Sequence, residues 1–293
     1  IYRAKELNSE TTVFAVLGDP IAQSLSPYMH NPAFVASGMN AVFLPLLVKD
    51  IGNFFRRMVR PESREVELNF GGFSVTMPHK QSIMPVLDAI DPTAASIGAV
   101  NTVKIDNDKL IGFNTDAPGF ITPLKAKFGE LNRTRVAVFG AGGAARAVVF
   151  ALKQENAEVT VYARDGQTSK ALADEFGVNS APLSSIGDSS SRLCDSHDIV
   201  VDTTPLGMKG PLENETLFSA DQLAGVKFVY DLVTKATDTP IIREAKLARI
   251  PTLGGIEMLI AQGMRQYEIW TGNAAPAETM RAAAFARFEY LRK

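Results

Sequence analysis

The sequence predicts an α/β protein of two domains, the second of which has a doubly wound parallel sheet. Its 293 residues are enough for two hydrophobic cores of ordinary size. Apolar strand patterns alternate with helix patterns along most of the chain, which is typical of sheets covered by helices. In the second half, a glycine-rich loop joins one of these strands to a helix. These three observations together favour the α/β class.

The first part of the chain alternates strands and helices. Residues 12–18 and 41–48 have strand patterns, and Pro45 places the second of these strands at an edge or a bulge. Helix patterns cover residues 28–37 and 50–60, the latter with Asp50 as the N-cap. The sequence Asp-Asn-Asp at 106–108 separates two further strand patterns and has the composition of a hairpin turn.

The second part of the chain has more strongly apolar strands, which begin at residues 135, 158, 198 and 226. A helix over residues 141–154 follows the first of them. Residues 188–195 form a polar loop, and the chain closes with helix patterns at 255–272 and 274–293. Buried strands separated by helices predict a parallel, doubly wound sheet in this part.

The composition is that of a soluble globular protein, with 46% hydrophobic and 21% charged residues. Thirty basic residues nearly balance 32 acidic ones, which argues against a partner such as nucleic acid or a membrane surface. No apolar run approaches the ~20 residues that span a bilayer. A single cysteine, Cys194, cannot form an internal disulfide, so we expect a cytoplasmic protein.

The glycine-rich loop, VFGAGGAARA, has the G-x-G-x-x-A pattern of a dinucleotide-binding turn. Gly140 permits the turn, Gly142 lets the backbone approach a pyrophosphate, and the following helix directs its unpaired N–H groups at the phosphates. Tight strand–helix packing alone would also explain such a loop. Because an apolar strand precedes it and an amphipathic helix follows it, we favour a Rossmann-type domain that binds a nicotinamide dinucleotide.

The choice between NADP and NAD depends on the end of the next strand, where the adenosine ribose binds. An arginine there favours NADP by pairing with the 2′-phosphate, whereas an acidic residue favours NAD by binding the ribose hydroxyls. This strand ends in Arg164, which favours NADP, and Asp165, which favours NAD. At this point both cofactors remain open.

Residues 74–80, SVTMPHK, form a strand that leads into a predicted helix. Alternation places the hydroxyls of Ser74 and Thr76 on one face of the strand, and Pro78 marks the start of a helix. Lys80 then has two interpretations. It is either an ordinary solvated helix lysine or the group that exchanges a proton with a substrate.

Oxidation or reduction by a nicotinamide also requires a proton donor or acceptor. The three histidines lie far apart in the sequence and do not form a metal-binding pattern, so we predict no metal site. The acid–base candidates are therefore Lys80 and Asp116. Asp116 could instead be the N-cap of the helix that starts near Pro118.

Seven motifs occur in order along the chain: GDPIAQSLSPYMHN (residues 18–31), SVTMPHK (74–80), GAVNTV (98–103), GFNTDAPG (112–119), GAGGAARA (140–147), TTPLGM (203–208) and GGIEMLIAQG (254–263). They span nearly the whole chain, and together they resemble the shikimate dehydrogenase family. The resemblance implies reversible, NADP-linked reduction of 3-dehydroshikimate to shikimate, a step of aromatic amino-acid biosynthesis. It also implies a substrate domain of residues 1–116 completed by the helices of 257–293, and a dinucleotide-binding domain of residues 117–256.

The resemblance also assigns roles to individual residues. It implies that Lys80 and Asp116 are the catalytic pair and that Ser24 and Ser26 bind the substrate carboxylate. The remaining substrate ligands that it implies are Ser74, Thr76, Asn101, Thr115 and Gln262. The implied cofactor contacts are Gly140, Ala141, Gly142, Gly143, Ala144, Arg164, Asp165, Thr204 and Met258. Without the resemblance, the serines would be turn residues, Asn101 a turn residue, Gln262 a surface residue and Met258 part of the core.

Three positions depart from the commonest pattern of the family. Ser74 replaces an asparagine, as in plant-type enzymes that are fused to a dehydratase. Thr234 replaces a tyrosine that assists at the substrate carboxylate, and Asp165 replaces a hydroxyl-bearing residue beside Arg164. We expect NADP as the cofactor, with NAD also possible.

Two other functions compete with this interpretation. The nearer one is a quinate or dual quinate/shikimate dehydrogenase that uses NAD. The more distant one is a regulator that binds a dinucleotide without catalysis, which retention of both Lys80 and Asp116 argues against. The first residue, Ile1, and the polar, linker-like residues 1–12 favour a fragment of a protein with an N-terminal dehydroquinate dehydratase domain. A plant-type precursor would be located in the plastid.

Overall fold

The computed structural model describes residues 2, 6–186 and 192–291. Over these residues the chain forms two compact units. The first contains the described residues up to Thr115 together with 262–291, and the second contains those from Asp116 to Ala261. Each unit has its own six-stranded sheet among the described residues, so the predicted α/β class is confirmed.

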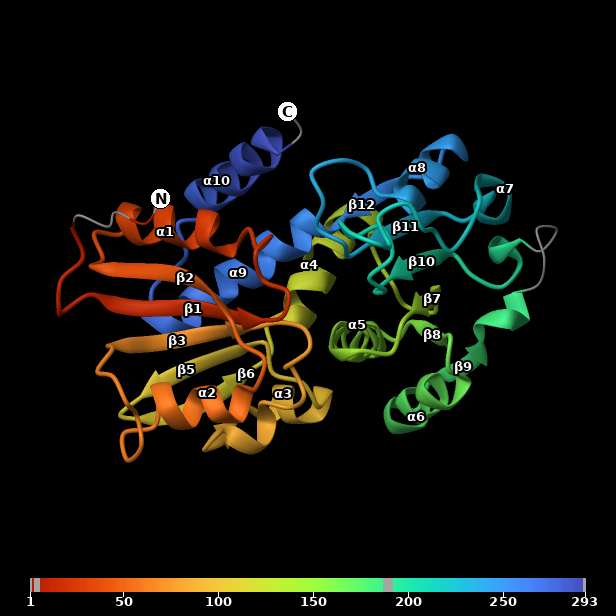
Figure 1. Cartoon of the computed structure of the whole chain (residues 1–293). Coiled ribbons are helices and arrows are strands. Elements are labelled where there is room, and N and C mark those ends of the chain that lie inside the picture. Colours follow the sequence, from red (N-terminus) through yellow and green to blue (C-terminus); the bar gives the residue numbers. More distant parts are fainter. Residues whose placement is uncertain (1, 3–5, 187–191, 292–293) are drawn as a thin grey trace. The chain divides into compact units, whose positions relative to one another are not determined.

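The sheet of the first unit is mixed, with the strand order β2-β1-β3-β5-β6-β4 (Figure 1). Its elements are β1 (Thr12–Gly18), α1 (Ser26–Ala36), β2 (Ala41–Leu47), α2 (Ile51–Met58), β3 (Phe70–Val75), β4 (Ala89–Ile90), α3 (Pro92–Ile97), β5 (Thr102–Asp106) and β6 (Lys109–Phe113). Pro45 lies on the edge strand β2, and Asp50 caps α2 by accepting a hydrogen bond from the Asn53 N–H at 2.9 Å. Both predictions are confirmed.

The hairpin predicted at residues 106–108 joins β5 to the antiparallel strand β6. Asn107 and Asp108 have φ values of 49° and 62°, so both central residues of the turn are left-handed. Asparagine and aspartate tolerate this conformation better than other residues with side chains, and it matches the twist of the paired strands.

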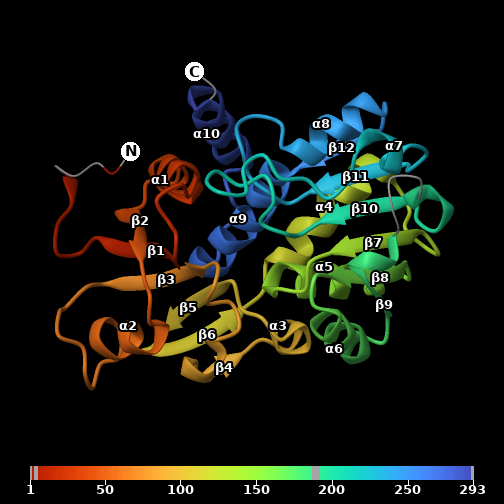
Figure 2. The ribbon, with the colours of Figure 1, turned by 45° about the vertical axis from the view of Figure 1, so that its right-hand side comes forward.

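Helices cover both faces of this sheet (Figures 1 and 2). On one face, α2 and α3 pack on Ala15, Leu17, Phe73 and Val75. The other face carries α1 and α9 (Gly255–Thr271), with α10 (Ala277–Tyr290) beside α1. Trp270 of α9 lies 5.1 Å from the ring of Phe14 and donates a hydrogen bond to the Val103 carbonyl at 2.9 Å. A helix from the end of the chain is thus part of the core of the first unit.

The sheet of the second unit is parallel throughout, with the order β12-β11-β10-β7-β8-β9. Its elements are α4 (Asp116–Phe128), β7 (Arg135–Phe139), α5 (Gly143–Gln154), β8 (Glu158–Ala163), α6 (Gly166–Phe176), β9 (Asn179–Pro182), β10 (Ile199–Asp202), α7 (Ala220–Leu223), β11 (Phe228–Asp231), α8 (Pro240–Leu247) and β12 (Thr252–Gly254). Phe120 of α4 stacks on Tyr230 on one face, while α7 and α8 bury the cluster around Phe139 and Val200 on the other. The doubly wound prediction is confirmed.

Two segments with sequence predictions lie partly outside the described residues. Of the polar loop predicted at 188–195, residues 188–191 lie outside the described residues. The rest is a 3₁₀ turn over Leu193–Asp195, in which Leu193 is buried. In the opening linker, Ile1 and residues 3–5 also lie outside the described residues.

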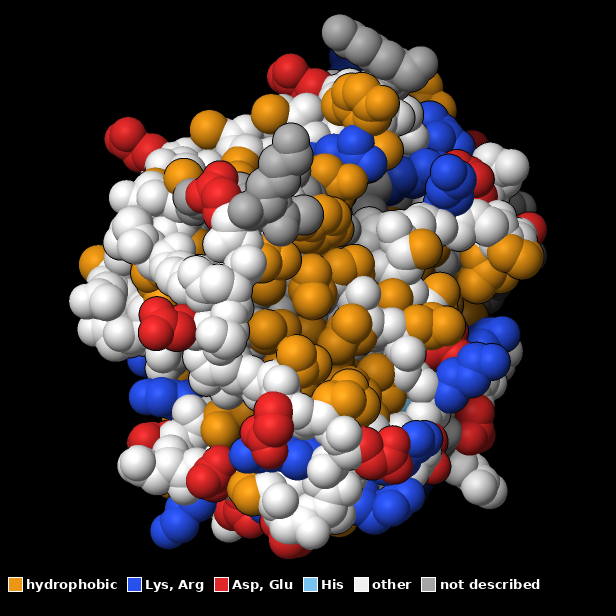
Figure 3. All heavy atoms as spheres, turned by 60° about the vertical axis from the view of Figure 1, so that its left-hand side comes forward, with side chains coloured by type: hydrophobic (Ala, Val, Ile, Leu, Met, Phe, Trp, Pro, Cys, Tyr) orange, Lys and Arg blue, Asp and Glu red, His pale blue; other side chains and the backbone are white. Residues whose placement is uncertain are grey.

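Large apolar side chains also remain at the surface. Figure 3 shows a face of the molecule on which apolar side chains gather. Leu247 and Tyr290 are among the exposed large apolar residues of the chain. More than half of the surface of a folded protein is apolar, so these residues do not by themselves identify a functional site.

Candidate active site

Most of the predicted catalytic and substrate-binding residues lie at one edge of the sheet of the first unit. β1 and β3 are parallel, and β6 runs in the same direction as β3 because each is antiparallel to β5. The carboxyl ends of these three strands therefore share an edge. The chain leaves this edge through the loop that leads to Ser24 and Ser26, through Thr76 to Lys80, and through Thr115 to Asp116. In α/β sheets, ligands bind where strands end in this way.

The segment after β3 is not the predicted helix. Residues 77–83 form consecutive turns, followed by a 3₁₀ helix at Met84–Val86, so the expectation of a helix starting at Pro78 is wrong. Pro85 explains the difference, because it supplies no N–H group and disfavours helical backbone at the residue before it. Ser74 and Thr76 nevertheless precede this turn as predicted, and Ser74 is buried.

Lys80 is half-buried within these turns, not a fully solvated helix lysine. Its carbonyl accepts a hydrogen bond from the Val100 N–H at 2.7 Å, which ties the turn to the residue before Asn101. The Asn101 carbonyl in turn accepts a hydrogen bond from the Val75 N–H at 2.7 Å. The backbone therefore fixes Lys80 and Asn101 to the same edge of the sheet.

Asn101, Thr115 and Gln262 form a buried polar cluster at this edge. The Asn101 amide donates to the Thr115 hydroxyl at 2.9 Å and to Gln262 Oε1 at 3.4 Å. Asn101 Oδ1 accepts from the Thr115 N–H at 2.7 Å. All three side chains are at most 8% exposed. The sequence alternatives of a turn asparagine and a surface glutamine are therefore wrong, because both side chains belong to one buried network.

Sequence reasoning missed Gln266, which extends this network. It lies one helical turn after Gln262 on α9 and is 1% exposed. Its Oε1 accepts from the Ser74 hydroxyl at 2.7 Å, and its Nε2 donates to the Thr102 hydroxyl at 3.1 Å. The spacing of four residues between two glutamines on one helix was the available signal, because such residues share a face. Ser74 thus has a structural partner in this network.

The serine pair lies at the start of α1. Ser26 is the first residue of the helix and is buried, while Ser24 is half-buried. The Ser24 hydroxyl accepts a hydrogen bond from the Ser26 N–H at 3.3 Å, as in a serine turn. The interpretation as turn residues therefore holds for Ser24, and it does not conflict with binding an anion, because hydroxyls can still donate.

His30 is a buried, neutral histidine on α1, four residues after Ser26. Its ring stacks on Phe43 at 4.5 Å, and neither ring nitrogen has a hydrogen-bond partner among the described residues. Burial lowers the pKa of His30 to about 3, although the nearby Gln266 side chain acts in the opposite direction. An imidazole in this environment stays uncharged at neutral pH.

This histidine should make the protein acid-sensitive. Below its ordinary pKa of 6.5, unfolded His30 binds a proton that the folded protein rejects, so the free energy of unfolding decreases as the pH falls from 6.5 towards 3. At pH 5 we expect a loss of about 2 kcal/mol. Urea unfolding at pH 7 and pH 5 measures this loss in wild type and in His30→Phe, which has an aromatic ring that cannot be protonated. Equal losses in the two proteins would rule out His30 as the cause.

The glycine loop of the second unit has the geometry of a dinucleotide-binding turn. Gly140 has φ +110°, and a Cβ there would lie 2.3 Å from the Thr203 hydroxyl, so glycine is required. A Cβ on Gly142 would have nothing within 4 Å, so the loop is open on that side. Ala141 and Gly142 precede α5, which begins at Gly143 and Ala144 and has unpaired N–H groups in its first turn. These residues fit the pyrophosphate of NADP.

Arg164 and Asp165 have different surroundings at the end of β8. Asp165 is the N-cap of α6 and accepts hydrogen bonds from the Gln167 N–H at 3.0 Å and the Thr168 hydroxyl at 2.5 Å. These bonds lower the pKa of Asp165. Arg164 is exposed. The carboxylate that argued against NADP in the sequence is thus engaged in capping a helix.

The other predicted cofactor residues lie in the same unit. Thr204 follows β10, and its N–H donates to Asp202 Oδ1 at 2.8 Å. Met258 is 7% exposed in the first part of α9, as the alternative of a core methionine predicts.

Asp116, the predicted catalytic partner of Lys80, is the first residue of α4 and is buried, with 4% exposure.

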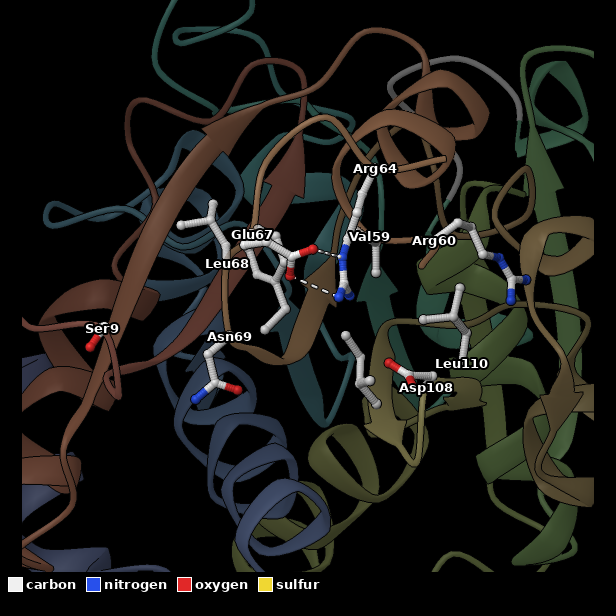
Figure 4. Close-up of a pocket in the computed structure, with 11 residues that line it drawn as sticks. Ser9, Val59, Arg60, Arg64, Glu67, Leu68, Asn69, Asp108 and Leu110 are labelled. Atoms are coloured by element: carbon white, nitrogen blue, oxygen red, sulfur yellow. Dashed lines mark hydrogen bonds and ion pairs between the residues drawn. The ribbon is translucent and has the colours of Figure 1, made fainter. Parts of the chain in front are cut away.

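A pocket of about 350 Å³ lies elsewhere on the first unit (Figure 4). It is lined by the segment between α2 and β3, by the start of β3 and by the β5–β6 hairpin, including Arg60, Arg64 and Asp108. Arg60 pairs with Asp88 at 2.8 Å, and Arg64 pairs with Glu67 at 2.8 Å. None of the predicted site residues lines this pocket. The pocket lies at the amino end of β3, whereas Thr76 follows the carboxyl end of that strand.

Among residues 2, 6–186 and 192–291, no group of three histidine, cysteine or acidic side chains is arranged to hold a metal ion. No helix in the same residues combines the length and apolar character needed to cross a bilayer.

Three family models match successive parts of the chain. The model described as shikimate dehydrogenase substrate binding domain matches residues 16–103. The model for shikimate/quinate 5-dehydrogenase matches residues 123–218, and the shikimate 5'-dehydrogenase C-terminal domain matches residues 255–285.

Curated proteins and solved structures are similar over almost the whole chain. Shikimate dehydrogenase (NADP(+)) of Methanopyrus kandleri is 37% identical, with 98% of each chain covered. The protein of the same name from Carboxydothermus hydrogenoformans is 38% identical, covering 94% of this chain and 98% of its own. A crystal structure of a shikimate dehydrogenase with NADP+ matches with a TM-score of 0.84 at 34% identity, covering 96% and 97% of the two chains. Shikimate 5-dehydrogenase of Thermus thermophilus with shikimate matches at 0.76 and 35% identity, covering 94% and 99%.

Proposed function

The chain belongs to the shikimate dehydrogenase family as an NADP-dependent oxidoreductase, and from this we propose how its residues reduce 3-dehydroshikimate reversibly to shikimate. The buried cluster of Asn101, Thr115 and Gln262 is the observation that carries the proposal. Its amide and hydroxyl groups lie at the edge that also carries Lys80. A site that pairs substrate hydroxyls in this way discriminates strongly against analogues that lack them.

Lys80 and Asp116 form the acid–base pair of this proposal. NADPH, when bound, supplies the hydride to the C3 carbonyl carbon. The Lys80 ammonium donates a proton to the C3 oxygen, which leaves a neutral amine and a C3 hydroxyl. Asp116 orients the ammonium and stabilises its charge, and in the reverse direction Lys80 takes the proton back. Asp116 follows Thr115, whose backbone N–H is held by Asn101, and this supports a fixed position for the carboxylate.

Ser24 and Ser26 bind the substrate carboxylate, while Thr76 and Ser74 complete the polar lining. The start of α1 supports this role, because hydroxyls and backbone N–H groups at a helix start suit an anion. For the cofactor, the proposal assigns the phosphates to Gly140–Ala144, the 2′-phosphate to Arg164, and the nicotinamide end to Thr204 and Met258. Asp165 caps α6 in this proposal, so its carboxylate has a structural role that does not require the ribose hydroxyls of NAD.

The domain assignment of this proposal is a substrate domain of residues 1–116 with 257–293 and a dinucleotide domain of residues 117–256. The proposal also includes a cytoplasmic location, or a plastid one for a plant-type precursor. The proposal finally includes a dehydroquinate dehydratase domain that precedes this chain in the full-length protein. Sequencing the complete reading frame tests this part of the proposal, because an initiator methionine directly before Ile1 would contradict it.

Thr234 favours a second candidate, a quinate or dual quinate/shikimate dehydrogenase that uses NAD. Threonine is smaller than the tyrosine usual at this position, which leaves room for a substrate with an additional hydroxyl.

Rates with shikimate and quinate, each with NADP and NAD, distinguish the candidates. We expect shikimate with NADP to give the highest kcat/KM, and Arg164→Ala to remove the preference for NADP by raising its KM about tenfold or more. Faster turnover of quinate with NAD would contradict the primary proposal.

A further inference from the structure

Two aspartates form a buried pair in the sheet of the second unit. Asp202 ends β10 and Asp231 ends β11, and the two are register partners on adjacent parallel strands. Their side chains therefore lie on the same face of the sheet, and they are 1% and 0% exposed. Phe139 is the register partner of Asp202 on its other side. Two acidic residues are thus in the carboxyl-end position where parallel sheets bind ligands.

The two carboxyl groups have unequal partners. Asp231 accepts hydrogen bonds with both oxygens, from the Val233 N–H at 2.9 Å and from the Thr239 hydroxyl. Asp202 accepts one hydrogen bond, from the Thr204 N–H, and its Oδ2 has no partner among the described residues. A buried anionic oxygen without a donor, next to a second carboxylate, is strongly unfavourable. The proton of the pair therefore belongs on Asp202.

Electrostatics agree with this geometry. Burial, followed by the charge of Asp231, raises the pKa of Asp202 to about 8. Asp198, just before the same strand, shows the opposite behaviour, because Arg135 and Lys227 bind its carboxylate and lower its pKa. The groups that act on the charge of Asp202 are Asp231 and the side chain and backbone of Thr204, and none of them is a cation.

The pair anchors the loop that follows β10. The Thr203 hydroxyl donates to the Phe139 carbonyl at 2.7 Å, directly before Gly140 of the glycine loop. Farther along the loop, a Cβ on Gly207 would lie 3.0 Å from Thr239, the residue that donates to Asp231. Asp202 thus fixes the loop at Thr204. Farther along, the loop packs on Thr239, the hydrogen-bond partner of Asp231.

We propose that Asp202 is a positioning residue that acts as a neutral carboxylic acid and holds the Thr203–Gly207 loop in place for NADP binding. Its Oδ1 fixes Thr204, and its protonated Oδ2 avoids repulsion from Asp231. Ionisation of Asp202 at alkaline pH places two charges side by side, which loosens the loop and weakens cofactor binding. The inference rests on the proposed role of Thr204 in binding the cofactor.

Direct NADPH binding, measured by fluorescence titration between pH 7 and pH 9.5, tests the proposal without involving the proton chemistry of Lys80. Asp202→Asn keeps an acceptor for Thr204 and cannot ionise, whereas Asp202→Ala removes the acceptor. Asp174→Asn, at an exposed position on α6, is the control for an ordinary loss of acidic charge. We expect the Kd of wild type and of this control to rise about fivefold over the range, and that of Asp202→Asn to stay constant.

At pH 7, Asp202→Ala should bind NADPH about fivefold more weakly than wild type, and Asp202→Asn should bind it normally. A pH-independent wild type, an Asp202→Asn variant that follows the wild-type curve, or an Asp202→Ala variant with unchanged affinity would each overturn the inference. If Asp202→Ala does not fold, the pH series of Asp202→Asn decides. Failure of wild type to bind NADPH at every pH would instead contradict the proposed function.

Discussion

Lys80→Ala should lower kcat about a thousandfold while the KM for shikimate changes little. The residue donates or accepts one proton in the chemical step, and binding of the substrate depends on the serine pair and the Asn101 cluster. Loss of an interaction that operates only in the transition state lowers kcat without weakening the ground-state complex. Steady-state kinetics with saturating NADP measure the effect.

The control for this experiment is Lys109→Ala. Lys109 is exposed at the start of β6, at the opposite end of that strand from Thr115 and Asp116. Its removal deletes the same charge from the same unit, and we expect wild-type kinetics. Near-normal kcat in Lys80→Ala would show that another group transfers the proton. A large rise in the KM for shikimate with unchanged kcat would instead make Lys80 a binding residue.

Gly140→Ala should destabilise the second unit and abolish useful cofactor affinity. Alanine at φ +110° is strained by about 1–3 kcal/mol, and its Cβ would lie 2.3 Å from the Thr203 hydroxyl. Relief of that contact requires movement of the loop after β10, which adds about 1–3 kcal/mol. Thermal unfolding without ligand and NADPH titration measure the two consequences separately.

Gly142→Ala is the matched variant, two residues away in the same loop. Its φ is −84°, and a Cβ there meets nothing within 4 Å, so the unliganded protein should keep its wild-type stability. The added methyl group nevertheless occupies the open side where the pyrophosphate is proposed to bind, so NADPH affinity should fall. Equal stability losses in the two variants, or unchanged NADPH binding in Gly142→Ala, would contradict this account of the loop.

The fold was predictable where local signals agree with tertiary structure. The β5–β6 hairpin followed from Asp-Asn-Asp between apolar runs, and the N-cap of α2 from Asp50. The parallel sheet followed from strands that are apolar on both faces. The predicted helix after Pro78 was wrong because Pro78 was interpreted as a helix start, while Pro85, which is unfavourable inside the same helix, was not considered.

The candidate site was less accessible to sequence reasoning, because its partners are distant in the chain. Ser74 and Gln266 are separated by 192 residues, and Asn101 and Gln262 by 161. No periodicity in either segment reports such a pairing, and only the similarity to a known family selected Asn101 and Gln262. The Asp202–Asp231 pair was invisible for a related reason. Each aspartate resembles an ordinary strand-end residue until the register of β10 and β11 brings the two together.

The order in which the elements of the first unit are synthesised has a consequence for folding on the ribosome. Its sheet is complete by Phe113, yet Gln266, Tyr267 and Trp270, which cover one face, come from residues 262–291. Meanwhile the described residues from 116 to 261 emerge as a separate compact unit. The nascent first unit therefore lacks the ring contacts of Phe14, Phe34 and Phe43 with Tyr267 and Trp270 until the last helices leave the exit tunnel. During translation this uncovered face is a natural binding target for chaperones that recognise apolar surface.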